Sequence, residues 1–363
     1  MLKLFFERWS CNAPDDHAVM LFPFWGMNGL DHDPDHPYIG TFDEYADIGT
    51  RFFEQTDLED ADFVVLPYHW ENIVNDEKRV ELASQTIEKA RQHGKKTIVF
   101  YWKDSCQKIP FDDTVVFRTS AYRSKKGSNE FIIPSWSEDI IAHRFGGLLQ
   151  TRHKEDRPTI SFRGLATYPD WRPKATIRRY YTKTKRLFVP NTYDERGHML
   201  RGRAIKLLEN EQRIRTSFEV QKEFFFYYQD KHILREEFIS NMMDSDYVLC
   251  VRGNGNFSFR FYEALCCGRI PVFIDTDCSL PYDFKVNWKD YCVWVDEKDV
   301  GSIGDIIIEY HEGLSDRDFI DMQEKCRSLW LDRICPTGFF SHFEEHFSAD
   351  NTCNNRFSHR TLS

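Results

Sequence analysis

The stretch DYVLCVRGNGNFSFRFYEALCCGRIPVFI, residues 246–274, sets how the second half of this chain folds. It opens with an apolar run at 246–251, passes through a glycine-containing segment at 252–257, and continues with a helical pattern over 258–267. Residues 270–274 form a second apolar run. A strand, a helix and a strand in so short a stretch predict a βαβ unit of a parallel sheet.

The first half of the chain shows the same alternation. Residues 62–67 and 96–102 are strand patterns, and residues 77–93 between them carry apolar side chains at helical spacing. The first residues of the chain and the runs at 115–117 and 131–133 are further strand candidates. We therefore predict an α/β protein with two doubly wound domains that face each other across a cleft.

Residues 142–158 are polar and rich in turn formers, which is typical of a linker. We accordingly predict a first domain over 1–150, a second over 151–335, and a tail over 336–363 that packs back on the first domain. A strand at 159–162, followed by a turn at Arg163 and Gly164, should open the second domain. Its remaining elements are predicted at 187–189, 196–212, 233–243, 291–295, 303–313 and 316–332.

Composition excludes several classes of protein. Among the 363 residues, 41% are apolar and 15% aromatic, which rules out a disordered or fibrous chain. The 48 Lys and Arg against 58 Asp and Glu give a net charge of −10, so nothing draws the whole chain to nucleic acid or anionic lipid. Charged residues interrupt every apolar run, which predicts no membrane-spanning segment. We expect a cytoplasmic protein, or a lumenal domain whose anchor has been removed.

The ten cysteines include no CxxC pair and no spacing typical of zinc ligands. Several stand in strand or helix patterns, so we interpret them as buried thiols in a reducing compartment. Their even number leaves disulfides open as the alternative.

Residues 252–258 join the strand to the helix and have the properties of an anion site. Two glycines let the backbone approach a ligand, the start of the helix presents unpaired N–H groups, and arginines stand on both sides. Serine replaces the last glycine of a G-x-G-x-x-G dinucleotide pattern, and no G-K-[ST] sequence follows. A plain turn is the alternative. We predict a diphosphate site formed by Arg252, Gly253, Asn254, Gly255, Ser258 and Arg260.

Glu263 lies on the same helix, among apolar residues. If this helix is buried, an unpaired carboxylate on it would be costly, which favours a specific role. We predict that Glu263 accepts hydrogen bonds from the 2′- and 3′-hydroxyls of a ribose. An exposed ion pair with Arg260 is the alternative.

The segment around these residues resembles the exostosin signature of glycosyltransferase family 47. Residues 258–272 match its pattern S-F-R-x-x-E-A-L-x-x-G-x-I-P-V, although Val251 stands where the family usually has a proline. Residues 59–68 are similar to the family's strand with the pattern ADxFxVP, and residues 162–164 are similar to its FRG turn. The three matches follow one another in the family's order.

The resemblance implies a GT-B fold, in which two Rossmann-like domains face each other and the second binds a nucleotide sugar, usually a UDP-sugar. It also implies an inverting transferase that needs no metal and passes the sugar to a glycan acceptor. Arg252 and Arg260 would then face the diphosphate, Glu263 the ribose, and Arg163 would lie near the phosphates. We interpret the sequence Asp275-Thr276-Asp277 as a strand-end loop, with a metal-binding pair as the alternative.

An inverting displacement needs a base that takes the proton of the acceptor hydroxyl. We expect it at the carboxyl end of a strand in the first domain, where Asp104 is the first candidate, His69 the second and Asp31 the third. Each of them could equally serve as a solvated loop residue. Trp25 and Trp70 stand next to loop signals and could stack on an acceptor sugar, with core packing as the alternative.

Two other classes of function remain open. One is a non-catalytic module that binds a nucleotide sugar or a glycan with the same fold. The other is a dinucleotide-dependent oxidoreductase, which the missing third glycine disfavours. A basic run is interpreted as a solvated helix face, with contact to phosphate or an anionic glycan as the alternative. It is formed by Lys174, Arg178, Arg179, Lys183, Lys185 and Arg186.

Overall fold

The computed structural model describes residues 1–9, 16–33, 36–168, 196–221 and 230–348. Among these, no helix has the length and apolar character needed to span a membrane. The chain divides into two compact units. Unit 1 comprises Met1–His143, Ser279–Trp288 and Ser328–Ser363, and unit 2 comprises Arg144–Cys278 and Lys289–Arg327. The domain limits at residues 150 and 335 stay a prediction.

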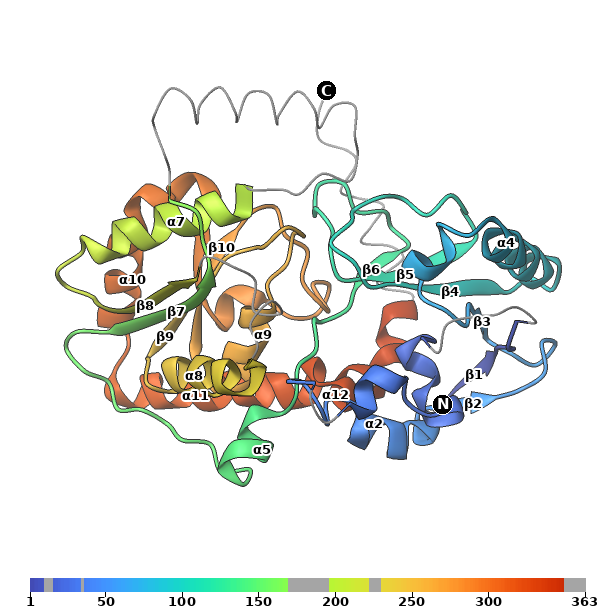
Figure 1. Ribbon diagram of the computed structural model, residues 1–363, viewed down its shortest axis with the longest axis horizontal. Helices are drawn as coiled ribbons and strands as arrows, with labels where there is room; N and C mark the ends of the chain where they lie inside the picture. Colours follow the sequence, from blue (N-terminus) through green and yellow to red (C-terminus); the bar gives the residue numbers. More distant parts are fainter. Residues whose placement is uncertain (10–15, 34–35, 169–195, 222–229, 349–363) are drawn as a thin grey trace. The chain divides into compact units, whose positions relative to one another are not determined.

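Unit 1 is built on a parallel sheet with the strand order β2-β1-β3-β4-β5-β6 (Figure 1). Since β2 and β3 lie on opposite sides of β1, the sheet has a topological switch point between β1 and β3. The sequence does not predict β2, because this strand has three residues of which two are exposed. The strands are β1 (Leu2–Phe5), β2 (Phe53–Gln55), β3 (Phe63–Val65), β4 (Lys96–Tyr101), β5 (Thr114–Arg118) and β6 (Glu130–Ile132).

Helices cover both faces of this sheet (Figure 1). On one face α4 (Glu77–Gln92) buries Ala83 and Ile87 at helical spacing, and it begins where the Asp76 carboxylate accepts the N–H of Arg79. On the other face α2 (Asp43–Ile48) and α12 (Pro336–Ser341) meet, with the rings of Tyr45 and Phe340 stacked 4.3 Å apart. The segment after Pro336 therefore contributes to the core of unit 1. Shorter helices are α1 (Phe22–Trp25), α3 (Trp70–Ile73) and α5 (Ile140–Phe145).

Unit 2 repeats this topology in a parallel sheet with the order β11-β10-β9-β7-β8 (Figure 1). Its switch point lies between β7 and β9. The predicted α/β fold class with two parallel sheets is thereby confirmed. The strands are β7 (Thr159–Leu165), β8 (Arg215–Gln221), β9 (Tyr247–Cys250), β10 (Ile270–Asp275) and β11 (Val293–Asp296).

Two details of the sequence prediction for unit 2 need correction. The expected turn at Arg163 and Gly164 is wrong, because β7 stays paired with β8 up to Leu165 opposite Gln221. Gly164 nevertheless uses its conformational freedom, with φ at +146° inside the strand. The sequence does not predict β8, which lies at the sheet edge and carries mostly exposed or half-exposed polar residues. The strand expected at 187–189 and the basic run lie outside the described residues.

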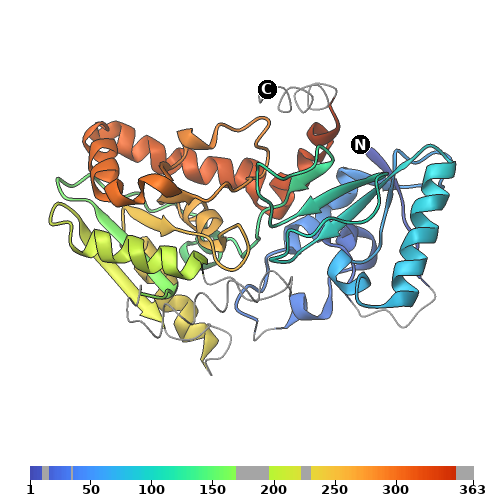
Figure 2. The same cartoon turned by 90° about the horizontal axis from the view of Figure 1, so that it is seen from above.

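Helices again lie on both faces of the sheet: α7 and α10 on one, α8 and α9 on the other (Figure 1). Figure 2 shows α7 lying along the sheet. Helices were expected over each of these segments, and the strand–helix–strand unit at 246–274 is confirmed. The helices are α7 (Arg196–Glu209), α8 (Lys231–Met243), α9 (Phe259–Cys266), α10 (Ile303–Glu312) and α11 (Asp316–Leu329).

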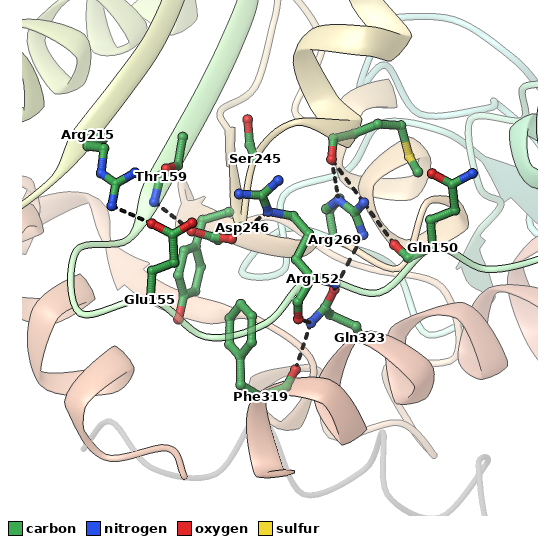
Figure 3. A network of polar contacts seen from close by, with 12 residues as sticks. Gln150, Arg152, Glu155, Thr159, Arg215, Ser245, Asp246, Arg269, Phe319 and Gln323 are labelled. Carbon is green, nitrogen blue, oxygen red and sulfur yellow. Dashed lines mark hydrogen bonds and ion pairs between the residues drawn. The ribbon is translucent and has the colours of Figure 1, made fainter. Parts of the chain in front are cut away.

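A buried polar network lies at the amino ends of β7 and β9 (Figure 3). The Asp246 carboxylate accepts the Arg152 Nε–H at 2.7 Å and the backbone N–H of Thr159 at 2.8 Å. Gln323 bonds both the N–H and the carbonyl of Arg152, and also accepts from buried Arg269. The network ties the segment before β7 to the amino end of this sheet.

The burial of the cysteines agrees with the sequence interpretation, and the reducing compartment stays a prediction. The eight that the structure describes are unbridged, and all of them except Cys106 are buried. Burial raises the pKa of the Cys326 thiol to about 12, so it stays protonated and packs as a small apolar group.

Candidate functional site

The loop of residues 252–258 leaves the carboxyl end of β9 next to β7, at the switch point of unit 2. It ends at Ser258, which directly precedes α9. The Ser258 hydroxyl is buried and finds no hydrogen-bond partner in the described part of the chain, so it does not cap its own helix. An unsatisfied buried hydroxyl beside the start of a helix, where the positive end of the helix dipole lies, is suited to an anionic ligand.

Helix α7 packs against this loop. A Cβ atom on Gly197 would collide with the carbonyl oxygen of Gly253, so only glycine permits this approach. The His198 ring contacts the Leu165 carbonyl at 3.3 Å and the Asn254 side-chain oxygen at 3.1 Å. The loop is therefore held in a fixed position relative to the end of β7.

Arg201 on α7 joins the ends of the two central strands. Its guanidinium donates to the carbonyl oxygen of Leu165 at 3.0 Å and to that of Val251 at 3.0 and 3.2 Å. Sequence reasoning missed Gly197, His198 and Arg201, because their partners lie more than thirty residues away along the chain. Glycine inside a helical pattern was the available signal for a close approach.

Arg260 lies across the end of β7. Its guanidinium stands 4.4 Å above the Phe162 ring and donates to the carbonyl oxygen of Arg163. A Cβ atom on Gly164 would come within 2.7 Å of Arg260 Nη2, the end of a flexible side chain, and it is the φ of +146° that favours glycine there. The Arg163 side chain is buried and pairs with the carboxylates of Glu219 and Glu237.

Arg252 folds over its own loop, with Nη2 donating to the Asn254 carbonyl at 2.7 Å. Arginine side chains thus gather around the carboxyl ends of β7 and β9. We refer to Arg163, Arg201, Arg252 and Arg260 as the arginine cluster. The structure brings the predicted residues 252–260 and Arg163 into this one region, although the predicted contacts with a nucleotide stay untested.

Glu263 is buried in α9, 2% exposed, and forms an ion pair with buried Arg235 of α8. Arg235 Nη1 donates to Glu263 Oε1 at 2.6 Å. The expectation of a buried helix is confirmed, and the alternative of an exposed pair with Arg260 is wrong. Its ribose role stays a prediction, and Arg235 is the partner that the sequence did not reveal.

The Asp275-Thr276-Asp277 segment supports the loop before α9. Asp275 Oδ1 accepts the N–H of Cys278 at 2.9 Å, and the Thr276 hydroxyl donates to the Asn256 side-chain oxygen at 2.6 Å. Asn256 in turn donates to the carbonyls of Thr276 and Asp277. Within the described ranges no group of three or more His, Cys, Asp and Glu side chains could hold a metal ion.

The switch point of unit 1 carries different groups. His69, in the loop after β3, has a buried ring whose Nδ1 lies 3.7 Å from Asp16 Oδ1. The Asp16 carboxylate also accepts from Asn28 at 3.3 Å and from Asn72 at 2.5 Å. Burial lowers the pKa of His69 to about 4, so the ring is neutral at pH 7, and its Nε2 has no partner among the described residues.

Two further carboxyl groups lie nearby. Glu71, at the start of α3, accepts the backbone N–H of Trp102 at 3.0 Å. Burial, with a smaller contribution from the charge of Asp16, raises the pKa of Glu71 to about 7 and that of Asp31 to about 6. We refer to Asp16, Asp31, His69 and Glu71 as the acidic cluster. Sequence reasoning missed Glu71, which looks like an ordinary acid in the first turn of a helix.

Asp104 is exposed in the loop after β4. This loop is held by Arg118, whose Nη2 donates to the carbonyl oxygens of Ser105 at 2.7 Å and of Gln107 at 3.0 Å. The role of Asp104 as a base stays a prediction.

The two tryptophans predicted to bind the acceptor lie in different surroundings. Trp70 is 3% exposed and packs edge-on against Phe111. Trp25 is half-buried, with the Arg8 guanidinium 4.6 Å from its ring. Trp25 is therefore the more accessible of the two, and stacking on a sugar stays a prediction for both.

Comparison with known proteins gives a family. A sequence model of the exostosin GT47 domain matches residues 48–309. A probable glucuronosyltransferase of Oryza sativa subsp. japonica is 28% identical over 211 residues, which are 55% of this chain and 43% of that protein. A probable beta-1,4-xylosyltransferase of Arabidopsis thaliana is 27% identical over 211 residues, 55% of this chain and 45% of that protein.

Exostosin-1 of Drosophila melanogaster is 36% identical over a shorter stretch of 73 residues, 20% of this chain and 10% of that protein. The matched stretches thus span less than half the length of these relatives.

Proposed function

The chain belongs to the exostosin GT47 family, and we propose that it transfers a sugar from a UDP-sugar to a hydroxyl group of a glycan. The observation that carries this proposal is the switch point of unit 2. There the arginine cluster, the start of α9 and the unsatisfied Ser258 hydroxyl surround the carboxyl ends of β7 and β9. Ligands of open parallel sheets bind at such a point.

The diphosphate is proposed to bind at the start of α9. Arg252 and Arg260 supply charge, Ser258 and the N–H groups of α9 supply hydrogen bonds, and Gly253 and Gly255 keep the backbone free of side chains. Arg163 lies beside Arg260 and is proposed to act on the same phosphates, once it exchanges its contacts with Glu219 and Glu237. Glu263 is proposed to accept the ribose hydroxyls while the ion pair with Arg235 holds its carboxylate in place.

The reaction is proposed to invert the anomeric carbon. A base on unit 1 takes the proton of the acceptor hydroxyl, the oxygen attacks the anomeric carbon, and the bond to the diphosphate breaks with its electron pair leaving on UDP. The developing negative charge is met by preorganised donors, which typically lower such a barrier by several kcal/mol. Metal is not needed in this scheme, because the arginine cluster neutralises the leaving group. Asp104, His69 and Asp31 are the residues that the sequence suggests as the base.

The named relatives guide the choice of substrate. Because two of them carry the names glucuronosyltransferase and xylosyltransferase, UDP-glucuronate and UDP-xylose are the first donors to test. Oligosaccharides of β-1,4-linked xylose are the first acceptors. UDP release above the background without acceptor would support transfer. UDP binding without any turnover would instead indicate a non-catalytic module.

A further inference from the structure

The binding of a diphosphate at the arginine cluster gives no role to the acidic cluster of unit 1. The acidic cluster gathers side chains from the segment after β1 and from the loop after β3, at the carboxyl end of the sheet and at its switch point. The residue after β4, Trp102, adds a backbone N–H that Glu71 accepts. We propose that Glu71, held by the backbone of Trp102, is the general base that deprotonates the acceptor hydroxyl. This inference rests on the proposed transfer reaction and names a residue for its proton step.

The position of Glu71 is fixed from two strands. It follows β3 in the chain, within the first turn of α3, while its Oε2 accepts the N–H of Trp102, the first residue after β4. Since β3 and β4 are hydrogen-bonded neighbours, this contact holds the carboxylate at the edge where both strands end. The groups of an α/β protein that act on ligands stand at this edge.

The His69 ring provides an independent sign of a ligand. It is 5% exposed, lies 5.8 Å from the ring of Trp102 and faces Asp16 through Nδ1. Its Nε2 is buried and has no hydrogen-bond partner among the residues that the structure describes. A buried ring nitrogen without a partner is costly, and a bound hydroxyl group would satisfy it.

The pKa also separates Glu71 from His69 as a candidate base. Its carboxyl faces Asp16 from the loop after β1 and Lys103 from the loop after β4, while burial is the main cause that brings its pKa to about 7. A base works best with a pKa near the pH of the reaction. His69, with a pKa of about 4, is a much weaker base, and we infer that it orients the acceptor.

The proton balance is simple. The Glu71 carboxylate takes the proton of the acceptor hydroxyl as the oxygen forms its bond to the anomeric carbon of the donor. The bond between that carbon and the diphosphate oxygen breaks, and its electron pair leaves with UDP. Glu71 then releases the proton to water and is ready for another turnover.

The test compares Glu71→Gln with Glu88→Gln. The control residue is an exposed glutamate of α4, paired with Arg91 and Gln92. UDP release from UDP-glucuronate and UDP-xylose, with xylo-oligosaccharides as acceptors, measures turnover, and calorimetry with UDP measures donor binding. Glu71→Gln should lower kcat by about 10²- to 10⁴-fold at unchanged UDP affinity. Glu88→Gln should leave both unchanged.

The pH profile of the intact protein is the second readout. kcat should fall tenfold per pH unit below about pH 7, because only ionised Glu71 accepts a proton. Full turnover of Glu71→Gln would overturn the assignment while leaving the transfer reaction intact. If Glu71→Gln failed to fold, a kcat independent of pH between about 5 and 8 would overturn it. An intact protein that neither binds UDP nor releases it would overturn both proposals.

Discussion

The six-stranded sheet of unit 1 and the five-stranded sheet of unit 2 share the order of their first five strands but differ in the side chains at their switch points. In unit 2 the loops around β7 and β9 hold the arginine cluster. In unit 1 the segment after β1 and the loop after β3 hold the acidic cluster. The topology therefore sets only the place of a site, and the side chains of the loops set its chemistry. The arginine cluster suits an anionic leaving group, and the acidic cluster suits a proton transfer.

The largest effect is expected from separating the buried pair that supports the unit 2 site. Arg235→Ala leaves Glu263 charged and unpaired in the core, which should lower the free energy of unfolding by about 3–5 kcal/mol. Urea unfolding measures this difference. The double variant Arg235→Met, Glu263→Leu removes both charges and should recover most of the stability but not the UDP affinity. A single variant as stable as the intact protein would contradict the buried pair.

A somewhat smaller effect is expected on turnover when charge is removed from unit 2. Arg260→Ala takes a guanidinium from the end of β7 and should lower kcat by about 10²-fold, because leaving-group charge is less well met. Steady-state UDP release measures this change. Arg213→Ala, at an exposed arginine paired with Glu211 and Asp305, is the control. If Arg260→Ala and Arg213→Ala had equal turnover, the arginine cluster would have no part in the reaction.

Removing a charge from unit 1 should raise the free energy of unfolding, whereas Arg235→Ala in unit 2 should lower it. Burial raises the pKa of Glu71 from 4.5 to about 7 in the folded chain. The protonated form is therefore favoured on folding, and the protein loses stability as pH rises from about 4.5 through 7. Glu71→Gln should stabilise the protein by up to about 3 kcal/mol at pH 8 and by little at pH 4.5.

Thermal unfolding at the two pH values measures this contrast. If Glu71 is a functional carboxylate that lowers the stability of the folded protein, Glu71→Gln should be more stable and less active than the intact protein. A Glu71→Gln protein that melts lower than the intact protein at pH 8 would instead indicate that Glu71 serves mainly to hold α3 against β4.

The smallest effect is expected from removing divalent ions. Because arginines and the start of α9 are proposed to meet the charge of the leaving group, EDTA should leave UDP release unchanged within about twofold. A loss of activity that Mg²⁺ or Mn²⁺ restores would instead indicate that Asp275 and Asp277 bind a metal ion. In this structure the two residues form hydrogen bonds that support the loop before α9.

The elements that the sequence predicts are those whose pattern is local. Residues 246–274 carry an uninterrupted strand, a helix and a second strand, and each is found. The edge strand β8 has too few apolar residues to be recognised, and Arg163 sits in a strand where its glycine neighbour suggests a turn. The sequence of one segment does not show that pairing with β8 continues β7 through Arg163 and Gly164.

The same limit applies to the sites. The residues at 252–263 are predictable because a helix start, glycines and arginines follow one another in the chain. Glu71 is not, since its environment is created by Trp102 and Asp16, which are distant in sequence. Arg201 is also missed, because it acts on the backbone carbonyls of two strands.

A structure determined with UDP bound would test the assignment of the unit 2 site most directly. We expect diphosphate oxygens within hydrogen-bond distance of the Ser258 hydroxyl and of the first N–H groups of α9, with Arg252 and Arg260 beside them. A nucleotide bound elsewhere, with the Ser258 hydroxyl still lacking a partner, would contradict the assignment.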